Sequence, residues 1–408
     1  MLDNIKKDFP VFENNPWLVF LDNAASVQKP WYVIDGVGDY LASSYANIHR
    51  WSYQLSALSE ELYHTSKHKI KKMLWARSSR LVYTYNASYA YNILVQSLVS
   101  SKKISSWDKV LLSSSEHHAN IVPWLEAQKH VDFDIEYITK DENYNICISD
   151  LEDKYDESVK VVSLTWMSNV TWSFLDLGKV SDIINSENTI YILDGSQYVP
   201  HRPVDFDEIG CDFLIFTGHK IMANTGIWVL IWKKDIFDNL ESTIWWGGSI
   251  QEVYKDKYSQ AVLPNRFEVG TPNLTGAVSL LKAFEYIESV GGFENIWKHE
   301  KEMTAYALKK AQDFLKDYPQ VSLIGSDSLE DRGFVFSFYV DGIHPDDIGM
   351  CMAEQNIAVR AWRHCAHVLM RECGLDKGTI RMSWYLYNDK TDIDKFFVEF
   401  GKSIDKLS

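Results

Sequence analysis

The chain has 408 residues, of which 46% are hydrophobic and 24% are charged, the composition of an ordinary globular protein. Its 56 acidic residues outnumber 41 basic ones and give a formal net charge of −15, which argues against nucleic acid or an anionic membrane surface as the partner. No apolar run is long enough to span a membrane, and the first residues show no secretory signal, so we expect a cytoplasmic protein. No Cys-x-x-Cys pair indicates a zinc knuckle, and the odd number of cysteines argues against a disulfide framework: Cys147, Cys211, Cys351, Cys365 and Cys373.

Short apolar runs alternate with helical patterns from about residue 80 to residue 280. The alternation predicts an α/β fold, in which a mostly parallel sheet is covered by helices on both faces. The predicted strands are residues 80–86, 109–115, 159–166, 189–195, 212–218 and 226–232, and two of the helices are residues 88–101 and 178–187.

The pattern changes from about residue 275 onward. Residues 275–291 and 295–319 read as long amphipathic helices, and residues 332–340, 357–362 and 378–388 read as strands of a smaller α+β domain. We therefore expect a large domain of residues 21–280, and a small domain made of residues 1–20 and 281–408.

Polar residues follow several of the predicted strands. Each has an ordinary explanation when taken alone, as a helix cap, a turn residue or a surface residue. Ligands of parallel sheets, however, bind at the carboxyl ends of the strands, where all of these residues would meet. They are Asn86, Ser88, His117, His118, Asn120, Asn169, Asp194, Gln197, Thr217, His219 and Lys220.

This set contains the groups that pyridoxal phosphate requires. A lysine in a dry pocket has a lowered pKa and forms a Schiff base. A buried carboxylate keeps the pyridine nitrogen protonated, so that the ring withdraws electrons. Hydroxyl groups and the amides of a helix N-terminus bind a phosphate, and a histidine stacks on the ring.

Several motifs then match one family in order. They are "FLDNAAS" near residue 20, "EHHANIVPW", "SNVT", "DGSQ", "TGHK", "RFEVGTPN", "RHCA" and "YLYND" near residue 389. The chain resembles the group II cysteine desulfurases, which are the SufS-type and selenocysteine-lyase-like enzymes of the class V aminotransferase family. The resemblance implies a fold-type I pyridoxal-phosphate transferase that works as a homodimer.

The same resemblance implies the residues of the cofactor site. Lys220 would bind the cofactor covalently and move protons, Asp194 would hold the pyridine nitrogen, and His117 would stack on the ring. The remaining cofactor contacts would be Gln197, Asn169, Ser88, Thr217, His219 and Thr271 of the neighbouring subunit. Ser88 stands where the family usually has threonine, and this change keeps the hydroxyl.

For the substrate, the resemblance implies L-cysteine, bound by Arg381, Asn169, His49 and Arg360. Cys365 would take its sulfur as a persulfide, leaving L-alanine, and His364, His118 or the cofactor would activate the thiol. The short loop around Cys365 implies a separate SufE- or SufU-like acceptor protein that passes the sulfur to iron–sulfur cluster assembly. Residues 247–268 match a hairpin placed near the neighbour's active site. Arg363 and Val368 depart from the family's usual histidine and proline.

Two kinds of alternative remain open at this point. The chain could be another class V enzyme, such as a selenocysteine lyase, a β-lyase or an aminotransferase. It could also be a non-catalytic scaffold of the same fold. Genuine tryptophans at positions where the family has glycine, described next, would favour this alternative.

Seven tryptophans stand where the family's motifs have glycine. An indole at such turns would clash, because glycine there supplies a left-handed backbone or a close approach. The chain has 15 tryptophans and only 20 glycines, whereas average usage would give roughly 29 glycines. We interpret the pattern as UGA codons that the cell reads as glycine; the alternative is a degenerate paralogue. The positions are Trp51, Trp107, Trp172, Trp228, Trp232, Trp362 and one of Trp245 and Trp246, here taken as Trp246.

Overall fold

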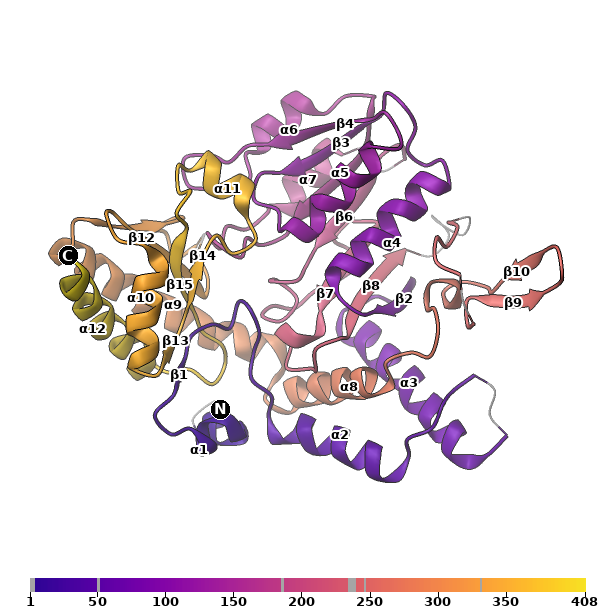
Figure 1. The fold of residues 1–408 in the computed structure, drawn as a ribbon, viewed down its shortest axis with the longest axis horizontal. Coiled ribbons are helices and arrows are strands. Elements are labelled where there is room, and N and C mark those ends of the chain that lie inside the picture. The colour runs from indigo at the N-terminus through magenta and orange to yellow at the C-terminus, as the bar shows by residue number, and fades with distance from the viewer. Residues whose placement is uncertain (1–3, 50–51, 185–186, 234–239, 246, 331) are drawn as a thin grey trace.

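The computed structural model describes residues 4–49, 52–184, 187–233, 240–245, 247–330 and 332–408 (Figure 1). A seven-stranded sheet forms its centre, in the order β2-β8-β7-β6-β5-β3-β4. β8 runs antiparallel to both of its neighbours, β2 and β7, and the remaining pairs of this sheet are parallel, which confirms the mostly parallel α/β sheet. The strands are β2 (Ser79–Thr84), β3 (Lys109–Ser113), β4 (Asp134–Ile138), β5 (Val159–Thr165), β6 (Ile190–Asp194), β7 (Phe213–Thr217) and β8 (Trp228–Lys233).

Both faces of this sheet are buried, which explains why its strands are continuous apolar runs rather than alternating ones. Val161 and Ile192 belong to a hydrophobic cluster with the helices α4 (Ala87–Ser100) and α5 (Val122–Gln128). Their chain neighbours Val162 and Leu193 point to the opposite face and pack with α3 (Gln54–Met73), α7 (Leu177–Ile183) and α8 (Leu274–Ser289). Other helices of this part of the chain are α2 (Trp31–Ser43) and α6 (Ile148–Lys154).

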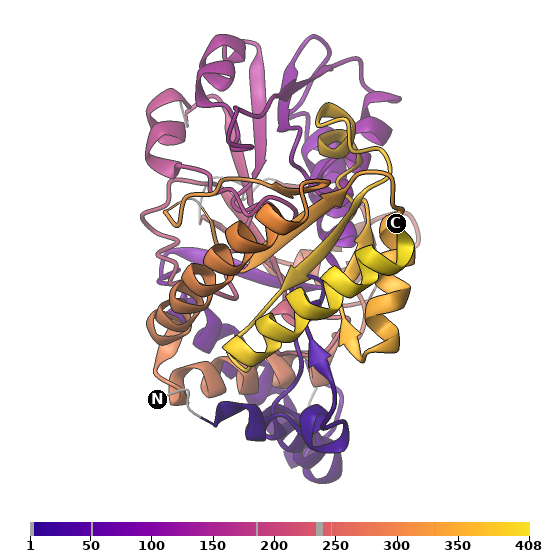
Figure 2. The same cartoon turned by 90° about the vertical axis from the view of Figure 1, so that its left-hand side faces the viewer.

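A second, antiparallel sheet has the order β11-β12-β15-β14. Figure 2 shows the long helices α9 and α12 lying across it. Its strands and helices share a separate apolar cluster, which confirms a smaller α+β unit near the C-terminus. The elements are β11 (Val321–Ile324), β12 (Val335–Val340), β14 (Arg360–Trp362), β15 (Thr379–Ser383), α9 (Gly292–Asp317), α10 (Pro345–Glu354), α11 (His367–Glu372) and α12 (Lys390–Leu407).

The N-terminal segment lies beside this second sheet. Its strand β1 (Val19–Phe20) pairs in parallel with β13 (Ile357–Ala358), so residues more than 300 positions apart become neighbours. The chain before β1 forms a 3-10 turn (Ile5–Asp8) and the short helix α1 (Pro10–Asn14). This pairing places the residues just after β1 next to β15.

Two predicted elements end four or more residues earlier than the sequence pattern indicates. The strand predicted over residues 378–388 stops at Ser383, because Asn388 folds the chain back with two hydrogen bonds to the backbone of Tyr385. The helix predicted over residues 178–187 ends at Ile183, and residues 185–186 lie outside the described part. A hairpin of β9 (Ile250–Val253) and β10 (Tyr258–Gln260) projects from the body in Figure 1, as expected for residues 247–268.

No helix in the described ranges is long and apolar enough to cross a membrane.

Candidate active site

Two adjoining cavities, of about 260 Å³ and about 40 Å³, lie at the carboxyl edge of the large sheet. They form one site, because both are lined by Ala87, His117, Asn169, Lys220 and Trp228. The structure therefore brings together most of the residues that the sequence predicts there. Their lining includes Ser88, His117, Asn169, Asp194, Gln197, His219, Lys220, Arg360, Cys365 and Arg381.

Lys220 ends a 3-10 turn (Gly218–Lys220) that directly follows β7. A side chain at Gly218 would meet the carbonyl oxygen of Ile227 at 2.7 Å, so only glycine fits this turn. Burial lowers the pKa of Lys220 to about 8, while the charge of Asp194 acts in the opposite direction. About a tenth of the amine is therefore unprotonated at pH 7, far more than for an ordinary lysine, as a Schiff-base lysine requires.

Asp194 is the last residue of β6 and is buried. Burial raises the pKa of its carboxyl, whereas hydrogen bonds from Ser196 and the charge of Lys220 act to lower it. One of these bonds is 2.9 Å from the Ser196 amide to Oδ1. A buried carboxylate of this kind suits a protonated ring nitrogen as its partner.

His117 lies after β3, where its Nδ1 accepts the amide of Ala119 at 3.1 Å. Burial, followed by the charge of Lys220, lowers the pKa of this imidazole to about 3. His117 is therefore neutral and can lie against a cationic ring without repulsion.

Several buried polar atoms at this site have no partner in the described part of the chain. Buried groups without a hydrogen bond are costly and rare. The atoms are Gln197 Oε1, Thr217 Oγ1, His364 Nδ1 and Arg381 Nε. Their chemistry fits a ligand that carries a ring oxygen, a phosphate and a carboxylate.

The phosphate end of such a ligand has a matching site at the start of α4. Asn86 caps this helix by accepting the Tyr89 amide at 2.8 Å, and Ser88 lies in the first turn. Helix N-termini favour anions because their amides and dipole point outward. His219, from the turn after β7, lines the same cavity as Ser88, whereas Thr217 is the last residue of β7 and does not line it. The residues present therefore fit pyridoxal phosphate.

Cys365 lies in the loop between β14 and α11, and its side chain is exposed. Both His364 and Cys365 have a left-handed backbone, with φ of 50° and 57°. Asn169 Nδ2 donates to the His364 carbonyl at 2.8 Å and thereby ties this loop to the loop after β5. Neither His364 nor His118 hydrogen-bonds the thiol within the described residues: His364 Nε2 contacts Thr379, and His118 Nε2 accepts the amide of residue 367.

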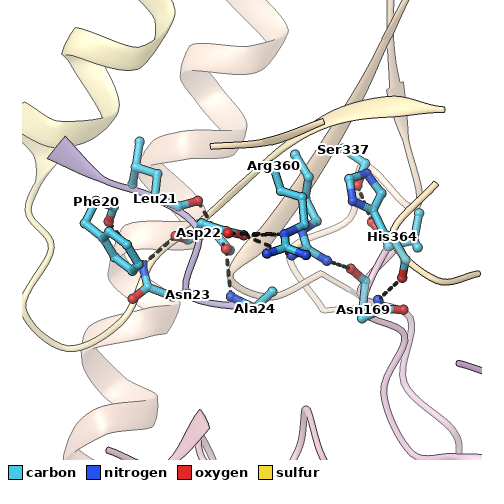
Figure 3. A network of polar contacts seen from close by, with 12 residues as sticks. Phe20, Leu21, Asp22, Asn23, Ala24, Asn169, Ser337, Arg360 and His364 are labelled. Carbon is cyan, nitrogen blue, oxygen red and sulfur yellow. Dashed lines mark hydrogen bonds and ion pairs between the residues drawn. The ribbon is translucent and has the colours of Figure 1, made fainter. Parts of the chain in front are cut away.

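Arg381 is buried in β15 and is held from two sides. Its Nη1 donates to the Asn169 carbonyl at 2.9 Å, and its Nη2 lies 3.2 Å from Asp22. Arg360 reaches the same carboxylate through Nε at 3.2 Å (Figure 3). The sequence interpretation missed Asp22, although an acidic residue directly after the apolar run "LVFL" was a usable signal.

His49 and Thr271 do not line these cavities. His49 is exposed, and its Nδ1 lies 3.6 Å from Glu60. Thr271 is also exposed, before α8. Their predicted contacts with substrate and with the neighbour's cofactor stay predictions.

Residues 19–396 match the profile of the aminotransferase class-V family. A probable cysteine desulfurase of Halalkalibacterium halodurans is 34% identical over 96% of this chain and 95% of that protein. The cysteine desulfurase of Haloferax volcanii is 30% identical over 97% and 95%. The apo structure of a cysteine desulfurase from Thermococcus onnurineus superposes with a TM-score of 0.91 at 29% identity, over 99% of this chain and 98% of the other.

Proposed function

The chain belongs to the class V aminotransferase family, and we propose that it is a pyridoxal-phosphate-dependent cysteine desulfurase. The observation that carries this assignment is that Lys220, Asp194 and Cys365 meet at one site. The lysine and the carboxylate suit cofactor chemistry, and an exposed thiol on the cavity wall suits sulfur transfer. A β-lyase or an aminotransferase would need no nucleophilic cysteine there.

Pyridoxal phosphate, when bound, would supply an electron sink for the substrate's α-carbon. Lys220 would bind it, Asp194 would keep a proton on its ring nitrogen, and Thr217, His219 and Ser88 would hold its phosphate. These roles are supported by the buried unpaired atoms and by the lowered pKa of Lys220.

The residues of this chain would then act on L-cysteine in a defined order. Arg381 binds the substrate carboxylate through its free Nε, and Asn169 keeps that arginine in place. The Lys220 amine takes the α-proton and later returns protons to the product. The Cys365 thiolate attacks the substrate's sulfur, so an S–S bond forms while the substrate's C–S bond breaks. L-Alanine leaves, and Cys365 keeps the sulfur as a persulfide.

Further parts of the proposal concern the protein's surroundings. We propose a homodimer, a cytoplasmic location and a SufE- or SufU-like acceptor that feeds iron–sulfur assembly. The exposure of Cys365 supports transfer to an outside partner.

We also propose that the chain divides into a large domain of residues 21–280 and a small domain of residues 1–20 and 281–408. This division is supported by the two separate sheets and by the β1–β13 pairing.

The test is to incubate the cofactor-loaded protein with L-cysteine and a thiol, and to measure alanine and sulfide. A desulfurase gives equal amounts of both. Pyruvate and ammonia would identify a β-lyase, and activity that needs a 2-oxo acid would identify an aminotransferase. L-Selenocysteine in place of L-cysteine separates a selenocysteine lyase. If none of these products forms, the scaffold alternative stands.

A further inference from the structure

His118 contacts the Cys365 loop at two points, one at the nucleophile's own carbonyl and one two residues further along the chain. Its backbone amide donates to the Cys365 carbonyl at 3.0 Å. Its imidazole Nε2 accepts the backbone amide of His367 at 3.2 Å. The two histidine rings also meet edge to face, with centroids 4.3 Å apart.

The second contact stabilises the start of α11. The first amides of a helix have no partner within the helix, and the residue before it usually caps them with a side chain. Ala366 occupies that position here and has no side-chain acceptor. His118, which lies 249 positions earlier in the chain, supplies the missing acceptor.

The loop that precedes α11 needs such support. His364 and Cys365 both have a left-handed backbone, which non-glycine residues adopt only when their surroundings impose it. Asn169 holds the His364 carbonyl, and His118 holds the next carbonyl and the amide of residue 367. Burial, and then the neighbouring His367, lower the pKa of His118, so its ring stays neutral and keeps the Nε2 lone pair.

We propose that His118 is a positioning residue that fixes the Cys365 loop through the first amide of α11. It touches neither substrate nor cofactor in this role, and it acts only through the placement of the thiol. Its loss would therefore lower kcat and leave the binding of L-cysteine, which depends on Arg381, unchanged.

Two matched pairs of variants test this role. Phenylalanine at residue 118 keeps the ring and loses the acceptor, whereas His118→Gln places an amide oxygen near the Nε2 position. His367→Pro removes the imidazole and the donating amide together, at a helix position where proline is well tolerated. His367→Ala removes the imidazole and keeps the amide, so the difference between the two variants reports the amide. His130→Gln changes an exposed histidine and serves as the control.

A role in placing Cys365 presupposes the proposed desulfurase activity, so hydrogen exchange is measured first, without substrate. In His118→Phe we expect exchange of residues 366–372 to speed up at least about 10-fold, while β3 and α5 stay protected. We expect kcat to fall about 10-fold in His118→Phe and His367→Pro, with KM within twofold. His118→Gln, His367→Ala and His130→Gln should resemble the unaltered protein.

Unchanged exchange in His118→Phe would overturn the proposal, and so would equal losses in the glutamine and phenylalanine variants. A rise in KM that accounts for the lost activity would also overturn it. If the unaltered protein makes no alanine, the proposed function fails, while the exchange data still decide whether His118 fixes the loop.

A separate observation concerns four tryptophans with a left-handed backbone. They are Trp75, Trp107, Trp172 and Trp362, with φ of 47°, 75°, 57° and 95°. Bulky residues rarely adopt this conformation, whereas glycine does so freely. Three of the four belong to the set that the sequence predicts as glycine, and Trp75 does not.

Trp75 follows the last turn of α3 at a position typical of glycine. Its amide donates to the Lys72 carbonyl at 3.3 Å, and the next amide, of Ala76, donates to the Lys71 carbonyl at 2.8 Å. These two bonds form the Schellman motif, in which the left-handed residue is usually glycine.

Trp172 crowds a neighbouring glycine. Its indole fills the space beside Gly333, so that a Cβ on that glycine would lie 1.3 Å from Nε1. Trp228 and Trp232 lie in the extended strand β8, so their backbone does not support glycine, and Trp51 and Trp246 lie outside the described residues.

We infer that residues 75, 107, 172 and 362 are glycine in the protein as its own cell makes it. The UGA interpretation supplies the cause, and it now extends to residue 75. Peptide mass spectrometry of the protein from that cell decides the matter directly. Glycine at all four positions, with tryptophan at residue 124, is the expected result, and tryptophan at the four positions would overturn the inference.

A second measurement uses recombinant protein that carries tryptophan at these positions. Trp75, Trp107 and Trp362 are exposed, so replacing each by glycine removes little packing. We expect the triple variant to raise Tm by about 5 °C or more, because glycine relieves the left-handed backbone. Trp124→Gly, which removes a buried indole from α5, should lower Tm. A fall in Tm of the triple variant would contradict the conformational argument.

Discussion

Asp22 and Arg381 form an ion pair of 3.2 Å at the junction of the two sheets. The pair exists because β1 adds to β13, which places Asp22 beside Ser383 of β15. The ion pair holds Nη2 of the guanidinium, and the Asn169 carbonyl holds Nη1. Nε is the Arg381 nitrogen that has no partner in the described part of the chain, so it can donate to a ligand.

Replacing Arg381 by lysine should weaken the binding of L-cysteine. A lysine ammonium cannot hold Asp22, Asn169 and a substrate carboxylate in one plane, as a guanidinium does. We expect KM to rise about 10- to 100-fold, with a smaller change in kcat. Steady-state alanine release measures both. Arg371→Lys, at an exposed position on α11, is the control and should leave KM unchanged.

Cofactor loading should depend on pH through Lys220. The amine reacts with an aldehyde only when it is unprotonated, and burial lowers its pKa to about 8. Loading of the apoprotein should thus be slow at low pH, half-maximal near pH 8, and fast above it.

Replacing Asp194 should shift the pH midpoint of cofactor loading in a defined direction. Its negative charge raises the pKa of Lys220 against the effect of burial. Asp194→Asn should therefore move the midpoint of the loading rate to lower pH, as followed by visible absorbance. Asp212→Asn, at another buried aspartate, should not move it. A midpoint that rises in Asp194→Asn would contradict the assigned electrostatics.

The cofactor residues could be predicted from the sequence for a simple physical reason. Asp194 and Lys220 each follow a buried apolar strand, and the carboxyl ends of neighbouring parallel strands must meet. The contacts of Asp22 and His118 could not be predicted in this way. Asp22 depends on the pairing of two-residue strands, and His118 caps a helix 249 positions away, so neither leaves a local pattern.

The surroundings of the Cys365 thiol also could not be predicted from the sequence. We expected His364, His118 or the cofactor to activate the Cys365 thiol. In the fold, both imidazoles make contacts to Thr379 and to a backbone amide instead. Spacing along the chain does not specify where an imidazole nitrogen points.

Cys365→Ser should abolish alanine release from L-cysteine. Serine preserves the size of the side chain but does not form a persulfide, so we expect a loss of at least about 1000-fold in kcat. Visible absorbance of the bound cofactor should be unchanged, since Lys220 is intact. Cys373→Ser, at a partly buried thiol, is the control. Full activity of Cys365→Ser would assign the reaction to a mechanism without a protein nucleophile.

Trp228 limits the room for the cofactor. Its indole lines both cavities next to Lys220, and its ring centroid lies 5.4 Å from that of His219. Trp228→Gly should enlarge the smaller cavity, which measures about 40 Å³, and lower the Kd of pyridoxal phosphate about 10-fold or more. Trp232→Phe changes the same strand away from these cavities and should leave Kd unchanged. Because Kd is measured on the apoprotein by titration, the result does not depend on turnover. A weaker Kd in Trp228→Gly would mean that the indole packs against the bound cofactor rather than competing with it for space.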